Sequence, residues 1–149
     1  MILISHRGNT NGRFENHENE PTYIDMALNK GFDVEVDVWY KDNMLWLGHD
    51  KPEYSVDNKF IIDRMDKLWV HCKNIEAIEF FMTCGWGLNY FWHETDTITL
   101  TSRGWIWAYP NKQPIKYSIA VMPELFNDNT TECIGICSDY IEKYKSLIK

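Results

Sequence analysis

The sequence predicts one α/β domain built around a parallel sheet or barrel, and three features of the chain lead to that prediction. Short apolar runs of strand length recur along the 149 residues. In the first half of the chain, segments with helical spacing of apolar residues lie between these runs. No repeat, low-complexity tract or linker interrupts the sequence, so residues 1–149 are expected to form a single domain.

The first thirty residues contain one strand signal, one loop signal and one helix signal. Residues 1–5 form a short apolar run, whereas residues 9–19 are polar and are expected to form a loop. Residues 21–31 begin with Pro21, place apolar residues at helical spacing and end with Gly31. These start, face and stop signals together predict a helix.

Alternation with a period of two predicts the next strand. Residues 32–40 alternate between apolar and acidic side chains, so valines share one face of the strand and three carboxylates share the other: Asp33, Glu35 and Asp37. Residues 41–43 have turn composition, and residues 44–48 return as a second strand. This hairpin is expected to deliver His49 at its end.

The second half of the chain keeps the strand signals but loses most helices. Residues 68–72 predict a strand, and residues 75–84, preceded by Asn74 and followed by Gly85, predict an amphipathic helix. Residues 95–110 contain two strand-like patterns with no helix between them, so the regular alternation ends there. Further strands and a carboxy-terminal helix are predicted at residues 88–92, 105–109, 117–122, 133–137 and 140–148.

Composition favours a globular protein and argues against some partners. Hydrophobic residues make up 44% of the sequence, which is enough apolar surface for one core. The formal charge is −7 and no run of Lys or Arg occurs, which argues against a nucleic-acid partner. No apolar segment approaches the roughly 18 residues of a membrane span, and the amino terminus does not resemble a secretory signal. We therefore expect a cytoplasmic protein whose four cysteines are free thiols.

Two histidines and two carboxylates occur on or just after predicted strands. His6 follows the first strand, Glu35 and Asp37 occur on the strand at 32–40, and His49 follows the hairpin. Because imidazole titrates near neutrality, His6 and His49 suit the two proton transfers of phosphodiester cleavage. Glu35 and Asp37 point to the same side of one strand, so they could hold a divalent cation.

Three further residues complete the predicted site. Arg7 and Lys73 would supply fixed positive charge for phosphate oxygens. Asp50 is expected to orient His49 or its loop rather than to take part in the chemistry. These candidates gather at the carboxyl ends of successive strands, where α/β folds place their sites. The combination predicts metal-assisted acid/base chemistry on a phosphate ester.

Several short motifs give the chain a resemblance to a known family. In order and in spacing, six of them resemble the amino-terminal signature of glycerophosphodiester phosphodiesterases: Ile4-Ser5-His6-Arg7-Gly8, Glu18-Asn19, Ala27-Leu28-Asn29-Lys30-Gly31, Val34-Glu35-Val36-Asp37-Val38, Lys41-Asp42-Asn43 and Leu47-Gly48-His49-Asp50. Residues 134–140 are similar to the last strand of that family, which typically reads Gly-Ile-x-Thr-Asp-x-Pro. The match therefore covers about the first third of the chain and its end.

The resemblance implies a TIM-type barrel that hydrolyses a glycerophosphodiester to glycerol phosphate and an alcohol. It also implies a divalent metal ion, Mg²⁺ or Ca²⁺, and a small-molecule phosphodiester as the partner. Carried over position by position, the matching residues are the general acid/base pair His6 and His49, the phosphate-contacting Arg7, the metal ligands Glu35 and Asp37, and the supporting Glu18.

The third strand departs from the family pattern. That strand usually carries Glu-x-Lys, whereas this chain reads His71-Cys72-Lys73, so the lysine is kept and the acid is not. If His71 completes the metal site, a softer ion such as Mn²⁺ or Zn²⁺ is favoured. Otherwise Glu94 or Glu124, each just beyond a later strand, takes that place. We place His71 ahead of the two glutamates.

Length is the second departure, because a full barrel needs about 250 residues and this chain has 149. We therefore expect a compact, truncated TIM-type barrel that lacks several helices in its second half, or an incomplete barrel closed by a partner chain. A shortened barrel with an aromatic-rich surface also favours a homo-oligomer.

Three functions remain open at this point. The leading one is a metal-dependent phosphodiesterase acting on a glycerophosphodiester or a related lipid headgroup, either by hydrolysis or by forming a cyclic phosphate. The second is a phosphate-binding module that has lost turnover together with the third acid. The third is a metal-dependent hydrolase of another ester that uses the same ligands.

Overall fold

The computed structural model describes residues 1–147, in which ten strands form one mixed sheet. The strands are β1 (Ile2–His6), β2 (Asp33–Lys41), β3 (Met44–Leu47), β4 (Tyr54–Val56), β5 (Leu68–Cys72), β6 (Asn89–Phe91), β7 (Ile98–Leu100), β8 (Ile106–Ala108), β9 (Ser118–Val121) and β10 (Gly135–Ser138). The helices are α1 (Pro21–Asn29), α2 (Asn58–Ile62) and α3 (Ile75–Thr83), with shorter 3₁₀ turns η1 (Glu15–His17), η2 (Pro123–Leu125) and η3 (Ile141–Leu147).

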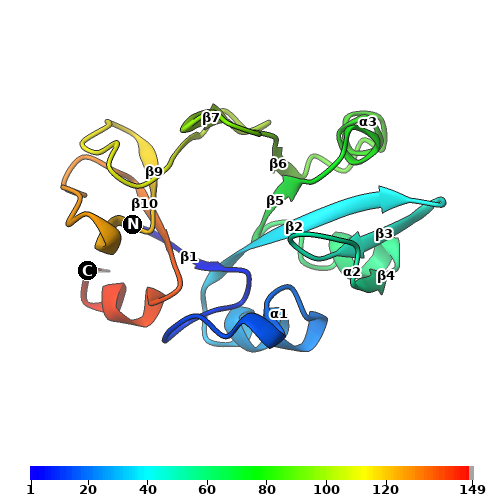
Figure 1. The fold of residues 1–149 in the computed structure, drawn as a ribbon, viewed down its shortest axis with the longest axis horizontal. Helices are drawn as coiled ribbons and strands as arrows, with labels where there is room; N and C mark the ends of the chain where they lie inside the picture. Colours follow the sequence, from blue (N-terminus) through cyan, green and yellow to red (C-terminus); the bar gives the residue numbers. More distant parts are fainter. Residues whose placement is uncertain (148–149) are drawn as a thin grey trace.

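The sheet curls on itself, but its two ends do not pair. Eight strands follow one another in the order β6-β5-β2-β1-β10-β9-β8-β7, and the β3-β4 hairpin branches from β2. Pairs along this path are parallel except that β7 runs antiparallel to β8. Figure 1 shows the strands following an arc, with α1 and α3 outside it. Within residues 1–147, β6 pairs with β5 alone and β7 with β8 alone, which leaves the curl open between them.

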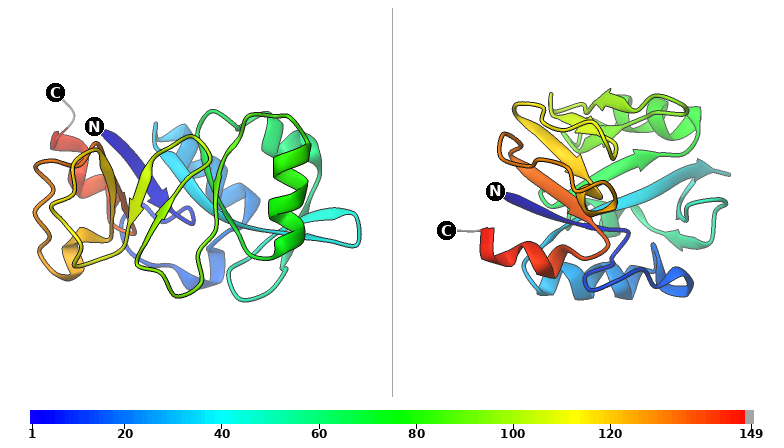
Figure 2. Two further views of the ribbon diagram at one scale, coloured as in Figure 1. Left: turned by 90° about the horizontal axis from the view of Figure 1, so that it is seen from above. Right: turned by 60° about the vertical axis from the view of Figure 1, so that its left-hand side comes forward.

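The expectation of a truncated TIM-type barrel was wrong. Such a barrel is a closed parallel ring in which a helix follows each strand, whereas this sheet is open and mixed. The three α-helices of the described residues all lie between β1 and β6, and short loops, a hairpin and η2 join the later strands. In the views of Figure 2, the yellow-green part of the chain runs as strands and loops without a helix. The fold is a mixed α/β structure around a curled, open sheet.

Alternating side chains separate an outer core from an inner one. On β2, Val34, Val36 and Val38 face outward and pack with helix residues such as Ile24 and Ala77. Side chains of the opposite parity face the inside of the curl, where seven buried residues form a second cluster: Ile4, Trp69, Phe91, Trp107, Ile119, Val121 and Cys137. The predicted division of β2 into a valine face and a carboxylate face is therefore confirmed.

Most predicted elements agree with the structure to within one or two residues, and the hairpin shows why. Asp42 and Asn43 form its turn with φ of +53° and +59°, the left-handed pair that suits the twist of two connected strands. Strand β4 and helix α2 were not predicted, although Asp57 caps α2 by accepting from the Phe60 N–H. The carboxy-terminal helix is the 3₁₀ helix η3, and position 148 of that prediction lies outside the described residues.

Two expectations about the whole chain can be compared with the structure. No helix among residues 1–147 is long and apolar enough to cross a membrane. All four cysteines are free, as expected, and three of them are buried.

Candidate functional site

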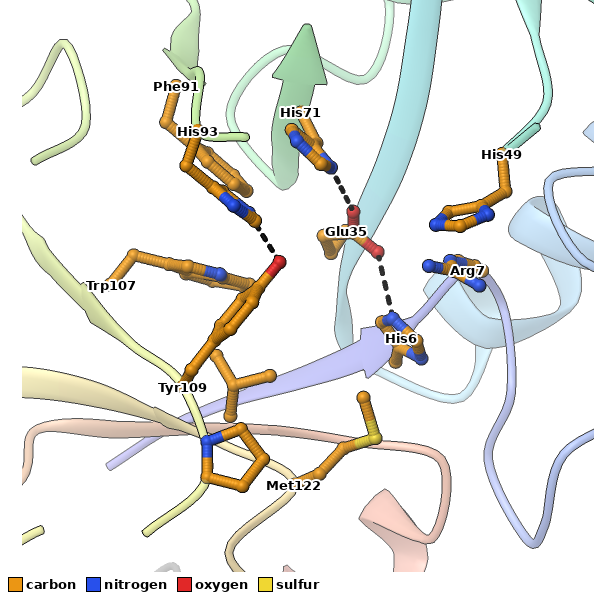
Figure 3. A pocket seen from close by; sticks show the side chains of 12 residues that line it. His6, Arg7, Glu35, His49, His71, Phe91, His93, Trp107, Tyr109 and Met122 are labelled. Atoms are coloured by element: carbon orange, nitrogen blue, oxygen red, sulfur yellow. Dashed lines mark hydrogen bonds and ion pairs between the residues drawn. The ribbon is translucent and has the colours of Figure 1, made fainter. Parts of the chain in front are cut away.

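A pocket of about 180 Å³ lies on the inside of the curl, at the carboxyl ends of the parallel strands (Figure 3). Ionisable side chains form one side, which we call the charged wall: His6, Arg7, Glu35, His49 and His71. The opposite side, which we call the aromatic wall, consists of Phe91, His93, Trp107 and Tyr109 and continues into Pro110, Val121 and Met122.

Strand alternation explains why polar groups gather at this end of the sheet. Side chains two residues apart on a strand point to the same side. On five strands, an apolar residue of the inner core is followed two positions later by a polar residue: Ile4 by His6, Trp69 by His71, Phe91 by His93, Trp107 by Tyr109, and Cys137 by Asp139. The strands therefore place a polar layer directly on the apolar interior.

The turn after β1 sets the position of Arg7. Arg7 and Gly8 have φ of +56° and +95°, and a side chain added at Gly8 would approach the Tyr23 ring to 2.6 Å. Glycine at that position removes the clash, while a left-handed arginine is a costly conformation of the kind found at functional sites. The turn brings the Arg7 guanidinium against Asp37, with 3.0 Å between Nε and Oδ2.

His6 is held from behind by a carboxylate. Its Nδ1 donates to Oδ1 of Asp139 over 2.7 Å, and Asn9 donates to the same oxygen over 2.9 Å. Its Nε2 faces Glu35, 3.9 Å from Oε2. Burial alone would lower the pKa of His6, but the hydrogen bond to Asp139 and the charge of Glu35 raise that pKa above its ordinary value.

His49 reaches the pocket from the loop after β3. Gly48 has φ of +145°, and any side chain there would collide with the Lys51 carbonyl, so the loop requires glycine. The Nδ1 of His49 donates to Asp50 over 2.7 Å, which agrees with the expected orienting role of Asp50. The His49 side chain is 40% exposed. Partial burial, aided by the charge of Arg7, lowers the pKa of His49.

Asp37 is the most heavily bonded residue of the site. Its Oδ2 accepts from Asn19 over 2.9 Å and lies against Arg7, while its Oδ1 accepts from His71 over 3.0 Å and lies 3.5 Å from the Lys73 ammonium. Burial alone would raise the pKa of Asp37, but the His71 hydrogen bond and the charges of Arg7 and Lys73 hold that pKa well below its usual range. Asp37 is therefore ionised and neutralised by cations.

Glu35 has the opposite surroundings, although it lies two residues away on the same strand. It is buried, and its Oε2 has no hydrogen-bond partner among the described residues. The nearest basic side-chain nitrogens are Nε2 of His6, 3.9 Å from Oε2, and Nδ1 of His71, 4.0 Å from Oε1. Burial, and then the charge of Asp37, raise the pKa of Glu35. A buried carboxylate without a hydrogen-bond partner is relieved either by a proton or by a positively charged ligand.

The structure brings together the three residues predicted to bind metal. Glu35, Asp37 and His71 each offer a ligand atom, and these atoms lie within 4.8 Å of one another. Two carboxylates and one imidazole form a donor set that divalent ions accept. The Oε2 of Glu35 has no partner within residues 1–147 and could bind such an ion. The oxygens of Asp37 already accept hydrogen bonds from Asn19 and His71, so they are less available to a metal.

The alternative third ligands lie elsewhere. Glu94 is exposed and does not line the pocket. Glu124 accepts hydrogen bonds from the hydroxyls of Ser138 and Tyr144 over 2.6 and 3.0 Å, respectively. Neither glutamate joins the cluster of possible metal ligands found in the described part of the chain, whereas His71 does.

The predicted phosphate-binding cations differ in their access to the pocket. Arg7 lines it and also donates to Glu18 over 3.1 Å. Glu18 is buried and accepts from Asn9 and Arg13 as well, so it supports the turn that carries Arg7. Lys73 is not among the residues that line the cavity, and its ammonium lies near Asp37.

The aromatic wall contains one polar pair. The Nε2 of His93 and the hydroxyl of Tyr109 are 2.6 Å apart. The His93 ring stacks on His71, with 4.5 Å between ring centroids, and Phe91 packs on Trp107 at 4.7 Å. Burial, and then the charge of His71, lower the pKa of His93 to about 4, so this imidazole is neutral near neutral pH.

Comparison of this chain with models of known families, with curated proteins and with solved structures finds no match.

Sequence reasoning did not assign four residues that shape the site. Asp139 orients His6, Asn19 bonds both to the side chain and to the backbone N–H of Asp37, and His93 and Tyr109 form the polar pair. A signal existed for the first two, because both fall inside motifs of the family resemblance. His93 and Tyr109 are revealed only by their position two residues beyond Phe91 and Trp107.

Proposed function

We propose that this chain is a phosphodiesterase that cleaves a small phosphodiester by acid/base catalysis with His6 and His49. The observation that carries the proposal is that both imidazoles line one pocket, and each donates from Nδ1 to a carboxylate, Asp139 or Asp50. Such a bond fixes the ring and leaves Nε2 for proton transfer. The motif resemblance supports a glycerophosphodiester or a related lipid headgroup as the substrate.

The surroundings of the two histidines suggest different roles for them. His6 lies between Asp139 and Glu35, whose negative charges favour the protonated ring. His49 lies near cationic Arg7 and is partly buried, and both conditions favour the neutral ring. We assign His6 to protonation of the leaving alkoxide and His49 to deprotonation of the attacking hydroxyl, whether that hydroxyl belongs to water or to the substrate.

The remaining charged groups serve the phosphate. Arg7 lines the pocket and donates from a planar guanidinium that suits phosphate oxygens. Asp37 and Glu18 hold Arg7 in place from behind. A divalent ion at Glu35, Asp37 and His71 would supply further positive charge to screen the phosphate.

A phosphate-binding module without turnover is the second candidate, and one observation favours it. Asp37 is already surrounded by His71, Arg7, Lys73 and Asn19. A metal ion must compete with these donors, since His71 cannot donate its Nδ1 proton to Asp37 and ligate a metal through the same atom. A chain that binds phosphate through Arg7 without holding a metal would bind but not cleave.

Hydrolysis assays distinguish the two candidates. Glycerophosphocholine and bis(4-nitrophenyl) phosphate are offered to the full chain with Mg²⁺, Ca²⁺, Mn²⁺ or Zn²⁺. We expect turnover with at least one ion, and a loss of about 100-fold or more in kcat for H6A and for H49A. His17→Ala is the matched control, because His17 is an exposed histidine bonded to Glu20 outside the pocket and should leave kcat unchanged.

Two outcomes would contradict the proposed catalysis. Full activity in both H6A and H49A would exclude the two-histidine mechanism. No turnover with any ion, together with saturable glycerol-phosphate binding by calorimetry, would replace the enzyme by the binding module.

Replacement of His71 tests the third ligand. His71→Glu is expected to move the metal preference toward Ca²⁺ or Mg²⁺, because a third carboxylate makes the donor set harder and more negative. Calorimetric titration with each ion measures the preference directly, and the activity profile gives a second readout. His17→Glu, the same change at an exposed histidine outside the pocket and the metal cluster, serves as the control. An unchanged metal profile in His71→Glu would remove His71 from the site.

A further inference from the structure

The aromatic wall poses a question that the proposed chemistry does not answer. Proton transfer and charge stabilisation use the charged wall, yet about half of the pocket lining is aromatic or apolar. Figure 3 shows the Tyr109 hydroxyl directed toward His93 at the inner surface of the pocket. Neither residue takes part in the proposed acid/base chemistry.

We propose that the Tyr109 hydroxyl, oriented by His93, donates a hydrogen bond to an oxygen of the alcohol part of the phosphodiester. The aromatic wall then selects a compact, flat and uncharged alcohol group. This inference rests on the proposed function, because it assumes that a phosphate ester occupies the charged wall.

The direction of the His93–Tyr109 hydrogen bond follows from the second nitrogen of the ring. The Nδ1 of His93 is buried and has no partner within residues 1–147. A proton on that nitrogen would be a buried N–H without an acceptor, which proteins avoid. The proton therefore belongs on Nε2, where the Tyr109 oxygen accepts it over 2.6 Å. The Tyr109 O–H is then free to donate to another group, and Tyr109 lines the pocket in which a ligand would lie.

Packing keeps this donor in place. The His93 ring stacks on the His71 ring at 4.5 Å and lies 6.0 Å from the Phe91 ring, and all three rings are nearly parallel. Tyr109 meets His93 edge-on at an interplanar angle of 88°. The backbone N–H of Tyr109 is also fixed by the Thr97 carbonyl over 2.9 Å. A donor whose ring and backbone are both held loses little entropy on binding.

The neighbours of Tyr109 define the chemistry of the group that fits. Phe91 and Trp107 offer flat apolar faces, and Val121 and Met122 extend the apolar surface. The cations and anions of the lining all belong to the charged wall. A cavity of about 180 Å³ lies below the range of about 300–1,000 Å³ typical of drug-sized ligands, so it holds a compact group.

Calorimetry with four phosphate probes tests this assignment on the full chain in Mg²⁺ buffer. The probes are inorganic phosphate, phenyl phosphate, 4-nitrophenyl phosphate and phosphocholine. We expect phenyl phosphate to bind at least tenfold more tightly than inorganic phosphate or phosphocholine. The nitro group adds an oxygen acceptor, so 4-nitrophenyl phosphate should bind a further three- to tenfold more tightly.

Two variants test the hydrogen bond itself. Tyr109→Phe should remove the advantage of the nitro group and leave phenyl phosphate binding unchanged. His93→Phe should have the same effect. The double variant should lose no more affinity for 4-nitrophenyl phosphate than either single variant, because His93 acts through Tyr109. Tyr117→Phe, a change at an exposed tyrosine outside the pocket, should alter none of these affinities.

A ligand-free measurement tests the proton position. In the ¹⁵N NMR spectrum of the histidine side chains, His93 should show its proton on Nε2. A proton on Nδ1 would overturn the inference, because Tyr109 would then donate to His93 and not to a ligand. An equal loss of affinity for phenyl phosphate and for 4-nitrophenyl phosphate in Tyr109→Phe would also overturn the inference.

The affinities separate failure of this inference from failure of the proposed function. Binding of inorganic phosphate with no gain for the aryl esters would remove the subsite and leave the phosphate site intact. Tighter binding of phosphocholine than of phenyl phosphate would show that the wall selects a cation. If no probe binds, the proposed function and this inference both fail.

Discussion

The two walls of the pocket are built by different means. The charged wall stands on β1, β2 and β5, where β2 is paired on both sides, and Asp37 ties Arg7, His71 and Lys73 together. The aromatic wall crosses from β6 to β8, two strands that do not pair with each other in residues 1–147. The contact between them is made by aromatic rings, such as those of Phe91 and Trp107. One wall therefore depends on the strand ladder and on charge, and the other on packing.

The largest expected effect comes from neutralising Asp37. Asp37→Asn should lower the free energy of unfolding by about 3–5 kcal/mol, because in these buried surroundings Lys73 loses its carboxylate and Arg7 keeps only that of Glu18. Urea denaturation in chelator-treated buffer measures the loss.

Glu35→Gln is the matched control, since it makes the same chemical change two residues away. It removes a buried charge whose Oε2 has no hydrogen-bond partner among the described residues, so stability should stay within about 1 kcal/mol of the parent or rise. Equal losses in the two variants would contradict the contrast drawn between the two carboxylates.

The second effect is smaller and depends on pH. Asp139→Asn should lower the free energy of unfolding by about 1.5–3 kcal/mol near pH 5–6, where the hydrogen bond from protonated His6 to Asp139 is intact. The pKa of Asp139 is depressed, because the His6 bond outweighs burial, so the contribution of Asp139 is present above its ordinary pKa of 3.8 and is lost as the pH falls through the lower folded value.

The contribution of His6 to stability depends on pH in the opposite direction. Its pKa is raised in the folded protein, so its contribution is complete below the ordinary value of 6.5 and is lost as the pH rises through the folded value. Urea unfolding of the parent and of Asp139→Asn from pH 3 to pH 9 should show a difference that peaks between these limits. A difference that does not vary with pH would show that the pair is not ionic.

The smallest effect is expected on the aromatic wall. Phe91→Leu should lower the free energy of unfolding by about 1 kcal/mol, because it keeps most of the buried volume. The loss should be the same at pH 5 and pH 8, since Phe91 packs mainly through its ring. A pH-dependent loss comparable to that of Asp139→Asn would indicate that the stacked histidines, and not packing, control this wall.

The charged wall could be predicted well from the sequence because its signals are local. The period of two on residues 32–40 placed Glu35 and Asp37 on one face, and the hairpin after it placed His49. His71 joined them because β5 pairs with β2 and sets Asp37 opposite His71. Parallel pairing of β5 with β2 therefore brings His71 to the two carboxylates.

The overall shape and the aromatic wall could not be predicted in the same way. Whether a curled sheet closes depends on pairing between β6 and the strands after it, which no local pattern encodes. The truncated barrel was expected from the motifs of the first fifty residues, and the absence of a helix in residues 95–110 was expected too, but the antiparallel pairing of β7 with β8 in that stretch was not. Tyr109 and His93 meet across that region, 16 positions apart.

The open edge between β6 and β7 gives the pocket a property that a closed ring would lack. Hydrogen bonds join β6 to the loop after β7 at Tyr90 and Ser102, and ring contacts such as that of Phe91 with Trp107 bridge the rest. A seam held largely by side chains separates at lower free energy than a full strand ladder. A ligand lying on the aromatic wall would therefore hold β6 and β8 together, and its binding would slow amide hydrogen exchange along these two strands.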